Sequence, residues 1–331
     1  MATPRIYVTR PLPEPAARLL REAPVEVRSW DRDDTPVARD VLLREVVDAD
    51  GVICLITEKM DAEAIERMAH CRVLAQVAVG YDNIDVPAAT RKGIFVTNTP
   101  GVLTETTADM GWAILMATAR RVAEGDKFTR SGRWKTWEIM GFTGQDVHGA
   151  TLGIVGMGRI GLAIARRAVG FAMPVLYHNR HRLSEEQERA VGGARHVPLD
   201  ELLQQSDFVV ISCALTPETR HLISERELGL MKRTAVLVNI ARGPIVDQRA
   251  LYRALVDNKI WAAGLDVYET EPVPMTEPLL KLDNVVLPPH LGSASVATRI
   301  KMATTAAENC LAGVRGEVPP NVVNPEAAER R

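Results

Sequence analysis

The fold follows from one segment, Thr151-Leu152-Gly153-Ile154-Val155-Gly156-Met157-Gly158-Arg159-Ile160-Gly161. Its apolar beginning has the length of a buried strand and ends directly in glycines, and residues of helical spacing come next. Gly156 permits a tight turn, Gly158 lets the backbone approach a pyrophosphate, and Gly161 lets helix and strand pack closely. A strand before the glycines and a helix after them is the context that a dinucleotide-binding turn requires.

The helix that opens at Arg159 and Ile160 adds an electrostatic reason for a nucleotide site. Amides at a helix N-terminus have no partner within the helix, and the helix dipole favours an anion there. We therefore expect the turn to bind the phosphates of a nucleotide cofactor. The alternative is an ordinary glycine-rich turn between a strand and a helix.

Length and composition predict two domains with sizeable cores. The chain has 331 residues, of which 46% are hydrophobic and 25% are charged. The formal net charge of −2 gives no reason to expect nucleic acid or a membrane as a partner. The four cysteines lack the spacing of a zinc site or a disulfide frame, so we expect no metal and a reducing compartment. No apolar run has the length of a membrane span, and an early strand leaves no room for a signal peptide, which favours the cytoplasm.

Strand-like and helix-like segments alternate along the chain, which predicts an α/β fold with parallel sheets. Turn residues at 97–101 and the pair Pro288-Pro289 mark two crossings between domains. A helix is expected to begin at Thr216, where a hydroxyl precedes a proline. Residues 128–149, rich in aromatics and glycine, are either an arm that packs on another subunit or a surface loop. The cofactor domain should contain six strands, at residues 152–155, 174–178, 208–212, 235–240, 262–267 and 285–287.

The second strand of this domain indicates which nicotinamide cofactor binds. An NAD site places an acidic residue about 20 residues after the glycines, at the end of that strand. Here the strand ends in Asn179-Arg180-His181-Arg182, and no carboxylate follows until Glu185. Asn179, Arg180 and Arg182 suit the 2′-phosphate of NADP(H), which a guanidinium can bind bidentately. NADP(H) is favoured and NAD(H) is possible; the alternative is that the basic residues are only solvated surface.

Three polar residues each follow the end of a predicted strand. They are Arg242, Glu271 and His290. Ligands of doubly wound sheets bind outside the carboxyl ends of the strands, so these side chains can converge beside the cofactor. Each residue alone has a plain reading as a surface arginine, a solvated acid or a loop histidine. Their joint placement predicts an active site.

These residue types suit the reduction of a small 2-oxo acid. That reaction needs a hydride from the nicotinamide and a proton for the carbonyl oxygen, which a histidine can provide near neutral pH. A carboxylate bonded to the other ring nitrogen fixes the tautomer and favours the protonated ring. An arginine can bind the substrate carboxylate and polarise the carbonyl group.

With these residues in place, the whole chain resembles the D-isomer-specific 2-hydroxyacid dehydrogenases, and within them most closely the glyoxylate/hydroxypyruvate reductases. Besides the glycine turn, the resemblance is carried by Val79-Gly80-Tyr81-Asp82-Asn83-Ile84-Asp85, Leu215-Thr216-Pro217-Glu218-Thr219, Asn239-Ile240-Ala241-Arg242-Gly243, Gly264-Leu265-Asp266-Val267 and Pro289-His290-Leu291-Gly292-Ser293-Ala294. Formate dehydrogenases have glutamine where Glu271 stands, and phosphite dehydrogenase has lysine at the Val79 position. Both activities are therefore disfavoured.

The resemblance implies His290 as proton donor and acceptor, Glu271 as its orienting partner and Arg242 as the substrate anchor. It implies that the backbone of Val79 and Gly80 binds the substrate carboxylate. Further residues expected to line the substrate pocket are Leu55 and Ser293. Residues expected near the nicotinamide or its ribose are Thr107, Cys213, Ile240, Asp266 and Gly292.

The family fold implies two Rossmann-like or flavodoxin-like domains with an active-site cleft between them. Residues 1–99 plus 290–331 would form a discontinuous substrate domain, and residues 100–289 the cofactor domain. Members are usually homodimers. The leading hypothesis is NADPH-dependent reduction of glyoxylate and hydroxypyruvate to glycolate and D-glycerate. The alternatives are an NAD-linked dehydrogenase of another small D-2-hydroxy acid, and a nucleotide-sensing scaffold with negligible turnover.

Overall fold

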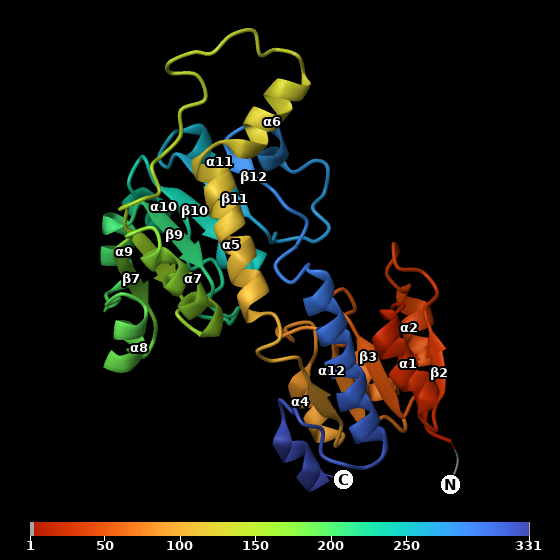
Figure 1. The fold of residues 1–331 in the computed structure, drawn as a ribbon. Coiled ribbons are helices and arrows are strands. Elements are labelled where there is room, and N and C mark those ends of the chain that lie inside the picture. Colours follow the sequence, from red (N-terminus) through yellow and green to blue (C-terminus); the bar gives the residue numbers. More distant parts are fainter. Residues whose placement is uncertain (1–2, 331) are drawn as a thin grey trace. The chain divides into compact units, whose positions relative to one another are not determined.

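The structure, a computed structural model, describes residues 3–330 and divides the chain into two compact units (Figure 1). Unit 1 contains the chain up to Leu103 and again from Ala294 onward, and unit 2 runs from Thr104 to Ser293. Every strand pair in the two sheets is parallel, as the alternating sequence pattern predicts. The α/β fold class is confirmed.

Unit 1 is built on a five-stranded sheet of order β2-β1-β3-β4-β5, the flavodoxin-like order. One core lies between the sheet and helices α2, α3 and α4, and a second core lies on the other face, under α1 and α12. The strands are β1 Arg5–Val8, β2 Glu26–Ser29, β3 Gly51–Cys54, β4 Val73–Gln76 and β5 Phe95–Thr97. The helices are α1 Glu14–Glu22, α2 Arg39–Glu45, α3 Ala62–Arg67, α4 Val86–Arg91, α12 Val296–Val314 and the 3-10 helix η3 Pro325–Arg330.

Unit 2 is built on a seven-stranded sheet of order β12-β11-β10-β9-β6-β7-β8. Counted from β6, the first six strands have the dinucleotide-binding order 3-2-1-4-5-6. The strands are β6 Leu152–Val155, β7 Val175–His178, β8 Arg195–His196, β9 Phe208–Ile211, β10 Val236–Asn239, β11 Ala262–Leu265 and β12 Val285–Val286. The helices are α5 Thr104–Ala119, α6 Val122–Arg130, α7 Arg159–Val169, α8 Glu185–Ala190, α9 Leu199–Gln205, α10 Glu225–Leu230 and α11 Gln248–Val256, with 3-10 helices η1 Gly243–Ile245 and η2 Pro278–Lys281.

The long apolar helix α5 packs on α7 and against strands β10 and β11 (Figure 1). Its Trp112 ring stacks on Phe171 with the ring centroids 4.7 Å apart, and the indole N–H donates to the carbonyl of Ile164. Ile114 and Leu115 are fully buried, and burying each such side chain stabilises the fold by roughly 1.5–3 kcal/mol. These contacts hold the glycine turn and the ends of β10 and β11 in one rigid unit.

The structure differs from the sequence expectation at several elements. The cofactor sheet has a seventh strand, β8, which at two residues is too short to show periodicity. Helices α4, α6, α8, α9, α10 and α11 were not predicted individually. Thr216 begins only one helical turn, in which its carbonyl accepts the N–H of Arg220 at 3.0 Å. The turn stops there because His221 has a φ of +51° and its N–H donates to the Pro244 carbonyl. Each crossing between units lies four residues later than expected, after Leu103 rather than 99 and after Ser293 rather than 289.

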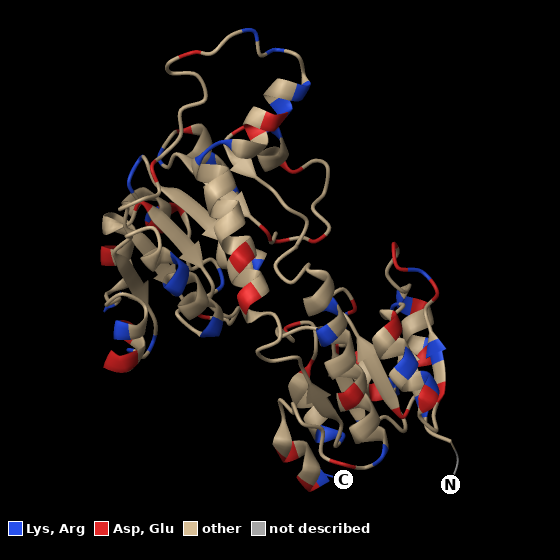
Figure 2. Cartoon of the chain, in the orientation of Figure 1, with Lys and Arg blue, Asp and Glu red and all other residues tan. Residues whose placement is uncertain are grey.

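Acidic and basic residues are interspersed with one another along both units (Figure 2). Such mixing leaves no large field of one sign to attract a polyanion. Within residues 3–330, every helix is too short or too polar to cross a bilayer.

Candidate active site

The glycine turn after β6 shows why each glycine is needed. Gly156 has a φ of +94°, and a Cβ there would lie 2.4 Å from the backbone nitrogen of Cys213. A Cβ on Gly161 would lie 2.6 Å from the carbonyl oxygen of Gly156. Any side chain at either position would therefore push β6 away from β9 or from α7.

Gly158 differs from its two neighbours, because a Cβ there would meet nothing within 4 Å. The residue caps α7, and no side chain in the described part of the chain caps that helix in its place. The N–H groups of the first turn of α7 are thus open to a phosphate. The turn lies between β6 and β9, where the strand order reverses and doubly wound folds bind their ligands. These features fit a dinucleotide pyrophosphate.

The loop after β7 is tied to the glycine turn through Asn179. The side-chain oxygen of Asn179 accepts the backbone N–H of Met157 at 2.6 Å. The ring of His196 is 3.0 Å from the Asn179 carbonyl oxygen. Asn179 therefore stands where an NAD site would have an acid, and it places no negative charge beside the ribose.

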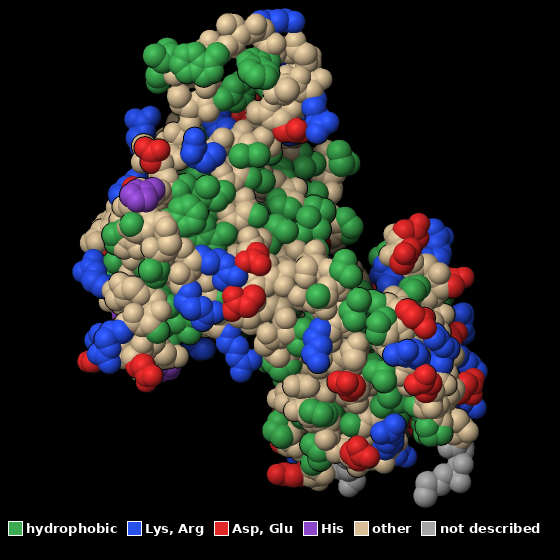
Figure 3. Space-filling view, viewed as in Figure 1, with side chains coloured by type: hydrophobic (Ala, Val, Ile, Leu, Met, Phe, Trp, Pro, Cys, Tyr) green, Lys and Arg blue, Asp and Glu red, His purple; other side chains and the backbone are tan. Residues whose placement is uncertain are grey.

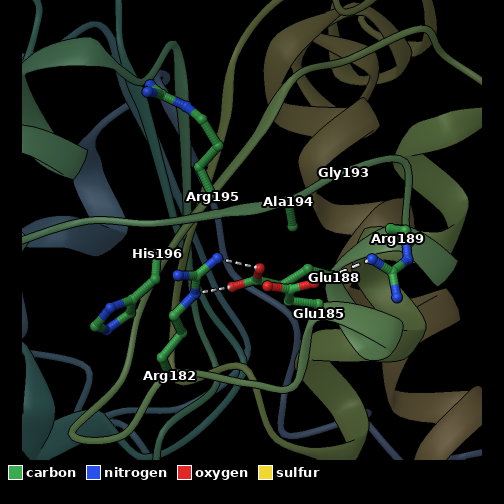
Figure 4. A pocket seen from close by; sticks show the side chains of 8 residues that line it. All are labelled: Arg182, Glu185, Glu188, Arg189, Gly193, Ala194, Arg195 and His196. Atoms are coloured by element: carbon green, nitrogen blue, oxygen red, sulfur yellow. Dashed lines mark hydrogen bonds and ion pairs between the residues drawn. The ribbon is translucent and has the colours of Figure 1, made fainter.

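Arg182 makes a two-point contact with Glu188, at 2.9 Å and 2.7 Å. Glu188 also accepts the hydroxyl of the buried Tyr177 at 2.7 Å. The hydrogen bond from Arg182, with that from Tyr177, lowers the pKa of Glu188 from 4.5 to about 2. Figure 4 shows Arg182 reaching across to Glu188 in a surface pocket, while Arg189 is paired with Glu185. Arg180 and Arg182 are both exposed, but the Arg182 side chain is paired with Glu188 of α8.

His290 and Glu271 lie in contact after strands β12 and β11, on the opposite side of the sheet from β7 and β8. Nδ1 of His290 is 2.6 Å from Oε2 of Glu271, and the two side chains are 28% and 32% exposed. The second carboxylate oxygen, Oε1, accepts the backbone N–H of Tyr268 at 2.9 Å. Burial raises the pKa of Glu271, but the hydrogen bond and charge of His290 outweigh it, and the net pKa is lowered. Glu271 is thus charged near neutral pH and uses both oxygens.

Asp266, at the end of β11, holds the backbone on which His290 stands. Its two oxygens accept the N–H groups of Leu291 and Gly292, each at 2.7 Å. His290 itself has a φ of +55°, a left-handed conformation that non-glycine residues adopt at a cost. Burial raises the pKa of Asp266 despite these hydrogen bonds. This acid therefore fixes the orientation of the imidazole.

Arg242 follows β10, and Asn239 shapes its loop. The amide of Asn239 donates to the carbonyl of Arg242 at 2.9 Å and accepts the N–H of Ala241 at 3.0 Å. A Cβ on Gly243 would overlap the backbone of Tyr268, so the loops after β10 and β11 pack directly together. The Arg242 charge is one of the influences that lower the pKa of Glu271. The structure therefore groups all three expected catalytic residues at the carboxyl edge of one sheet.

The other expected residues of unit 2 lie on the same edge. A Cβ on Gly292 would lie 3.4 Å from the methyl carbon of Thr107. Ile240 contacts α5 at Gly111, and burial raises the pKa of the Cys213 thiol to about 11, so that thiol stays neutral. Ser293 is the last residue of the unit.

Within residues 3–330, no three His, Cys, Asp or Glu side chains are grouped as a metal site would require.

The remaining expected residues belong to unit 1, which is described by itself. Leu55 directly follows β3, and Val79 and Gly80 follow β4. All three are partly exposed at the carboxyl edge of their own parallel sheet. That is the edge where ligands of such sheets bind.

Sequence reasoning did not find the residues that hold the site in place. Asn239 and Tyr268 adjoin the loops of the expected catalytic residues, and Glu188 restrains the expected cofactor loop. The available signal was weak: each is a polar residue close to a strand end or helix. Asp266 was expected at the nicotinamide, and its two hydrogen bonds to the His290 loop give it a structural task as well.

Comparison with known proteins identifies the family. Residues 112–292 match the family model described as the NAD binding domain of D-isomer specific 2-hydroxyacid dehydrogenases. The chain belongs to this family. The dehydrogenase is 53% identical over 329 residues to a glyoxylate reductase of Korarchaeum cryptofilum, a match that covers 99% of this chain and 98% of the relative.

Solved structures agree over the whole length of this D-2-hydroxyacid dehydrogenase. A protein from Thermus thermophilus is similar with a TM-score of 0.90 at 44% identity, covering 96% of this chain and 99% of that one. An NADPH-dependent glyoxylate/hydroxypyruvate reductase from Sinorhizobium meliloti, solved with NADP and malonate, has a TM-score of 0.82 at 32% identity, covering 100% and 99%. The dehydrogenase is thus an oxidoreductase with the two-sheet fold of its family and a nicotinamide-nucleotide domain.

Proposed function

We propose that this dehydrogenase reduces glyoxylate and hydroxypyruvate to glycolate and D-glycerate, with NADPH preferred over NADH. The observation that carries the proposal is the 2.6 Å contact between His290 and Glu271, on the same sheet edge as Arg242 and the open glycine turn. The relatives named glyoxylate reductase support the choice of substrate.

Three side chains have separate roles in the proposed reaction. The bound nicotinamide nucleotide supplies the hydride. Because Glu271 engages Nδ1 of His290, the ring presents Nε2 to the substrate and delivers the proton to the carbonyl oxygen from there. The negative charge of Glu271 stabilises the protonated ring before transfer. Arg242 binds the substrate carboxylate and polarises the carbonyl group.

The preference for NADPH rests on the loop after β7. Asn179 replaces the acid that would bind a ribose 2′-hydroxyl, and Arg180 is the exposed guanidinium beside it. Arg182 is held by Glu188, so we assign the 2′-phosphate mainly to Arg180, with Arg182 as a supporting positive charge. A relative solved with NADP is named NADPH-dependent.

The partner that we propose is a second copy of the chain. After α6 the chain continues in an arm, residues 131–146, where hydrophobic side chains gather at the top of Figure 3. Trp137 is 76%, Ile139 80% and Met140 72% exposed. Apolar side chains so exposed in one segment are typical of a protein interface. Light scattering should give the molar mass of a dimer.

The test is nicotinamide absorbance in a matrix of substrates and cofactors. Glyoxylate, hydroxypyruvate and pyruvate are each incubated with NADPH and with NADH. Fast oxidation of NADPH by the first two supports the proposal. Turnover only with NADH would favour an NAD-linked dehydrogenase, and cofactor binding without any turnover would favour the nucleotide-sensing scaffold.

A further inference from the structure

Unit 1 contains a polar cluster under the two loops that follow β3 and β4. Its members are Gln76, Asn83 and Glu58; Gln76 is fully buried, Glu58 is 3% exposed and Asn83 is partly buried. We call these three residues the loop clamp. Buried amides and carboxylates need a full set of partners, and here the partners are the backbone groups of both loops.

In the loop after β4, Gln76 of the clamp donates hydrogen bonds to two carbonyl oxygens. The amide nitrogen of Gln76 donates to the Gly80 carbonyl at 3.3 Å and to the Asn83 side-chain oxygen at 2.8 Å. The neighbouring Val79 carbonyl is held by Asn98 at 2.8 Å. In the described part of the chain, the N–H groups of Val79 and Gly80 have no acceptor. Two successive N–H groups without an acceptor are available to bind an anion such as a carboxylate.

Toward the loop after β3, the clamp holds Leu55 at both of its backbone groups. The amide nitrogen of Asn83 donates to the carbonyls of Leu55 and Glu58, at 3.0 Å and 2.8 Å. The Leu55 N–H donates to the Glu58 carboxylate at 2.9 Å. One side chain, Asn83, thus joins the loop of Leu55 to the loop of Gly80 through Gln76.

We propose that Gln76 and Asn83 are positioning residues that set the distance between the Val79–Gly80 amides and Leu55. This proposal rests on the proposed function, in which those amides bind the substrate carboxylate and Leu55 lines the pocket. The Ala78 and Val79 carbonyls, which accept from Thr99 and Asn98, fix the peptide planes that carry the two free N–H groups. Gln76 holds the next carbonyl, that of Gly80, and through Asn83 ties this loop to Leu55, which fixes the width of the site. Neither residue takes part in hydride or proton transfer.

Asn83→Ala tests the proposal, with Asn324→Ala as the matched control. Asn324 is a buried asparagine of the same unit; its oxygen accepts one N–H and its nitrogen donates to two oxygens, as in Asn83, but it ties β5 to α4. We expect Asn83→Ala to raise KM for glyoxylate about tenfold, the loss of about one well-placed hydrogen bond to the carboxylate. The Ki of oxamate should rise in parallel, while kcat and KM for NADPH stay within about twofold.

Asn324→Ala should lower Tm about as much as Asn83→Ala does, without changing KM for glyoxylate. If both variants change KM equally, the clamp is only structural and the proposal is wrong. If Asn83→Ala does not fold, Gln76→Leu, which keeps the side-chain volume nearly constant, provides the same comparison. A wild-type protein that does not reduce glyoxylate would refute the proposed function instead. A wild type that is active beside an unchanged Asn83→Ala would refute this inference alone.

Discussion

Replacing Glu271 with glutamine tests how the carboxylate supports His290. The wild-type carboxylate accepts two hydrogen bonds, from the His290 ring at Oε2 and from the Tyr268 N–H at Oε1. A glutamine has one accepting oxygen, so its NH2 group must face one of these two donors. If it faces the ring, Nδ1 has to be an acceptor, and the protonated imidazole is excluded.

The expected fall in kcat follows from the hydrogen bond between Glu271 and His290 that is lost. A bond between charged groups contributes roughly 1.5–3 kcal/mol, and exposure of about a third of both side chains puts this pair at the lower end. About 1.4 kcal/mol corresponds to tenfold in rate or one pH unit. We therefore expect Glu271→Gln to lower kcat for glyoxylate reduction at least about tenfold at neutral pH.

The assay is kcat for glyoxylate reduction at neutral pH with saturating NADPH. Glu269→Gln is the control, since Glu269 lies two residues away and contacts His221 and Gln248 rather than His290. It should leave kcat unchanged. A Glu271→Gln variant with the wild-type kcat would refute the reasoning.

Four further variants test other parts of the structure. Gly156→Ala should destabilise the protein by at least about 2 kcal/mol, because its φ is +94° and its Cβ would press on the Cys213 backbone. Gly158→Ala has open space around its Cβ. It should keep the wild-type Tm and show a lower affinity for NADPH in a fluorescence titration. Arg180→Ala should raise KM for NADPH about tenfold and leave KM for NADH unchanged, and an equal change in both would mean that this arginine does not bind the 2′-phosphate. The pKa of Glu188 is about 2 in the folded protein, against an ordinary value of 4.5. Its charge therefore stabilises the fold fully at pH values above 4.5, and this stabilisation is lost as the pH falls from 4.5 toward 2. The Tm difference between wild type and Glu188→Gln should accordingly be constant above about pH 5 and close below it, and a gap that widens in acid would contradict the ion pair.

The parts of the fold that were predictable are those whose signal is local. The glycine turn was recognisable because each glycine answers a steric need of a strand-turn-helix unit. Arg242 and His290 were predictable because parallel strands bring their carboxyl ends to one edge, so that residues distant in sequence meet. Short β8 was missed because two residues carry no periodicity.

The unpredicted features depend on partners that only the folded chain brings together. The Arg182 side chain was expected at the cofactor, yet its guanidinium lies against Glu188, six residues later across a turn. The helix expected at Thr216 stops after one turn because the N–H of His221 bonds to the carbonyl of Pro244, which is distant in sequence. The clamp formed by Gln76 and Asn83 joins two loops whose separation in sequence hides their contact in space.

The central claim, that His290 delivers the proton, is tested most directly by kcat/KM for glyoxylate in His290→Asn beside the wild type. NADPH binding is measured by fluorescence on the same preparations. General acid catalysis contributes about 10²–10⁴-fold. We predict a fall of at least about a hundredfold in kcat/KM with unchanged affinity for NADPH. A variant that keeps kcat/KM within about threefold of the wild type would contradict the account.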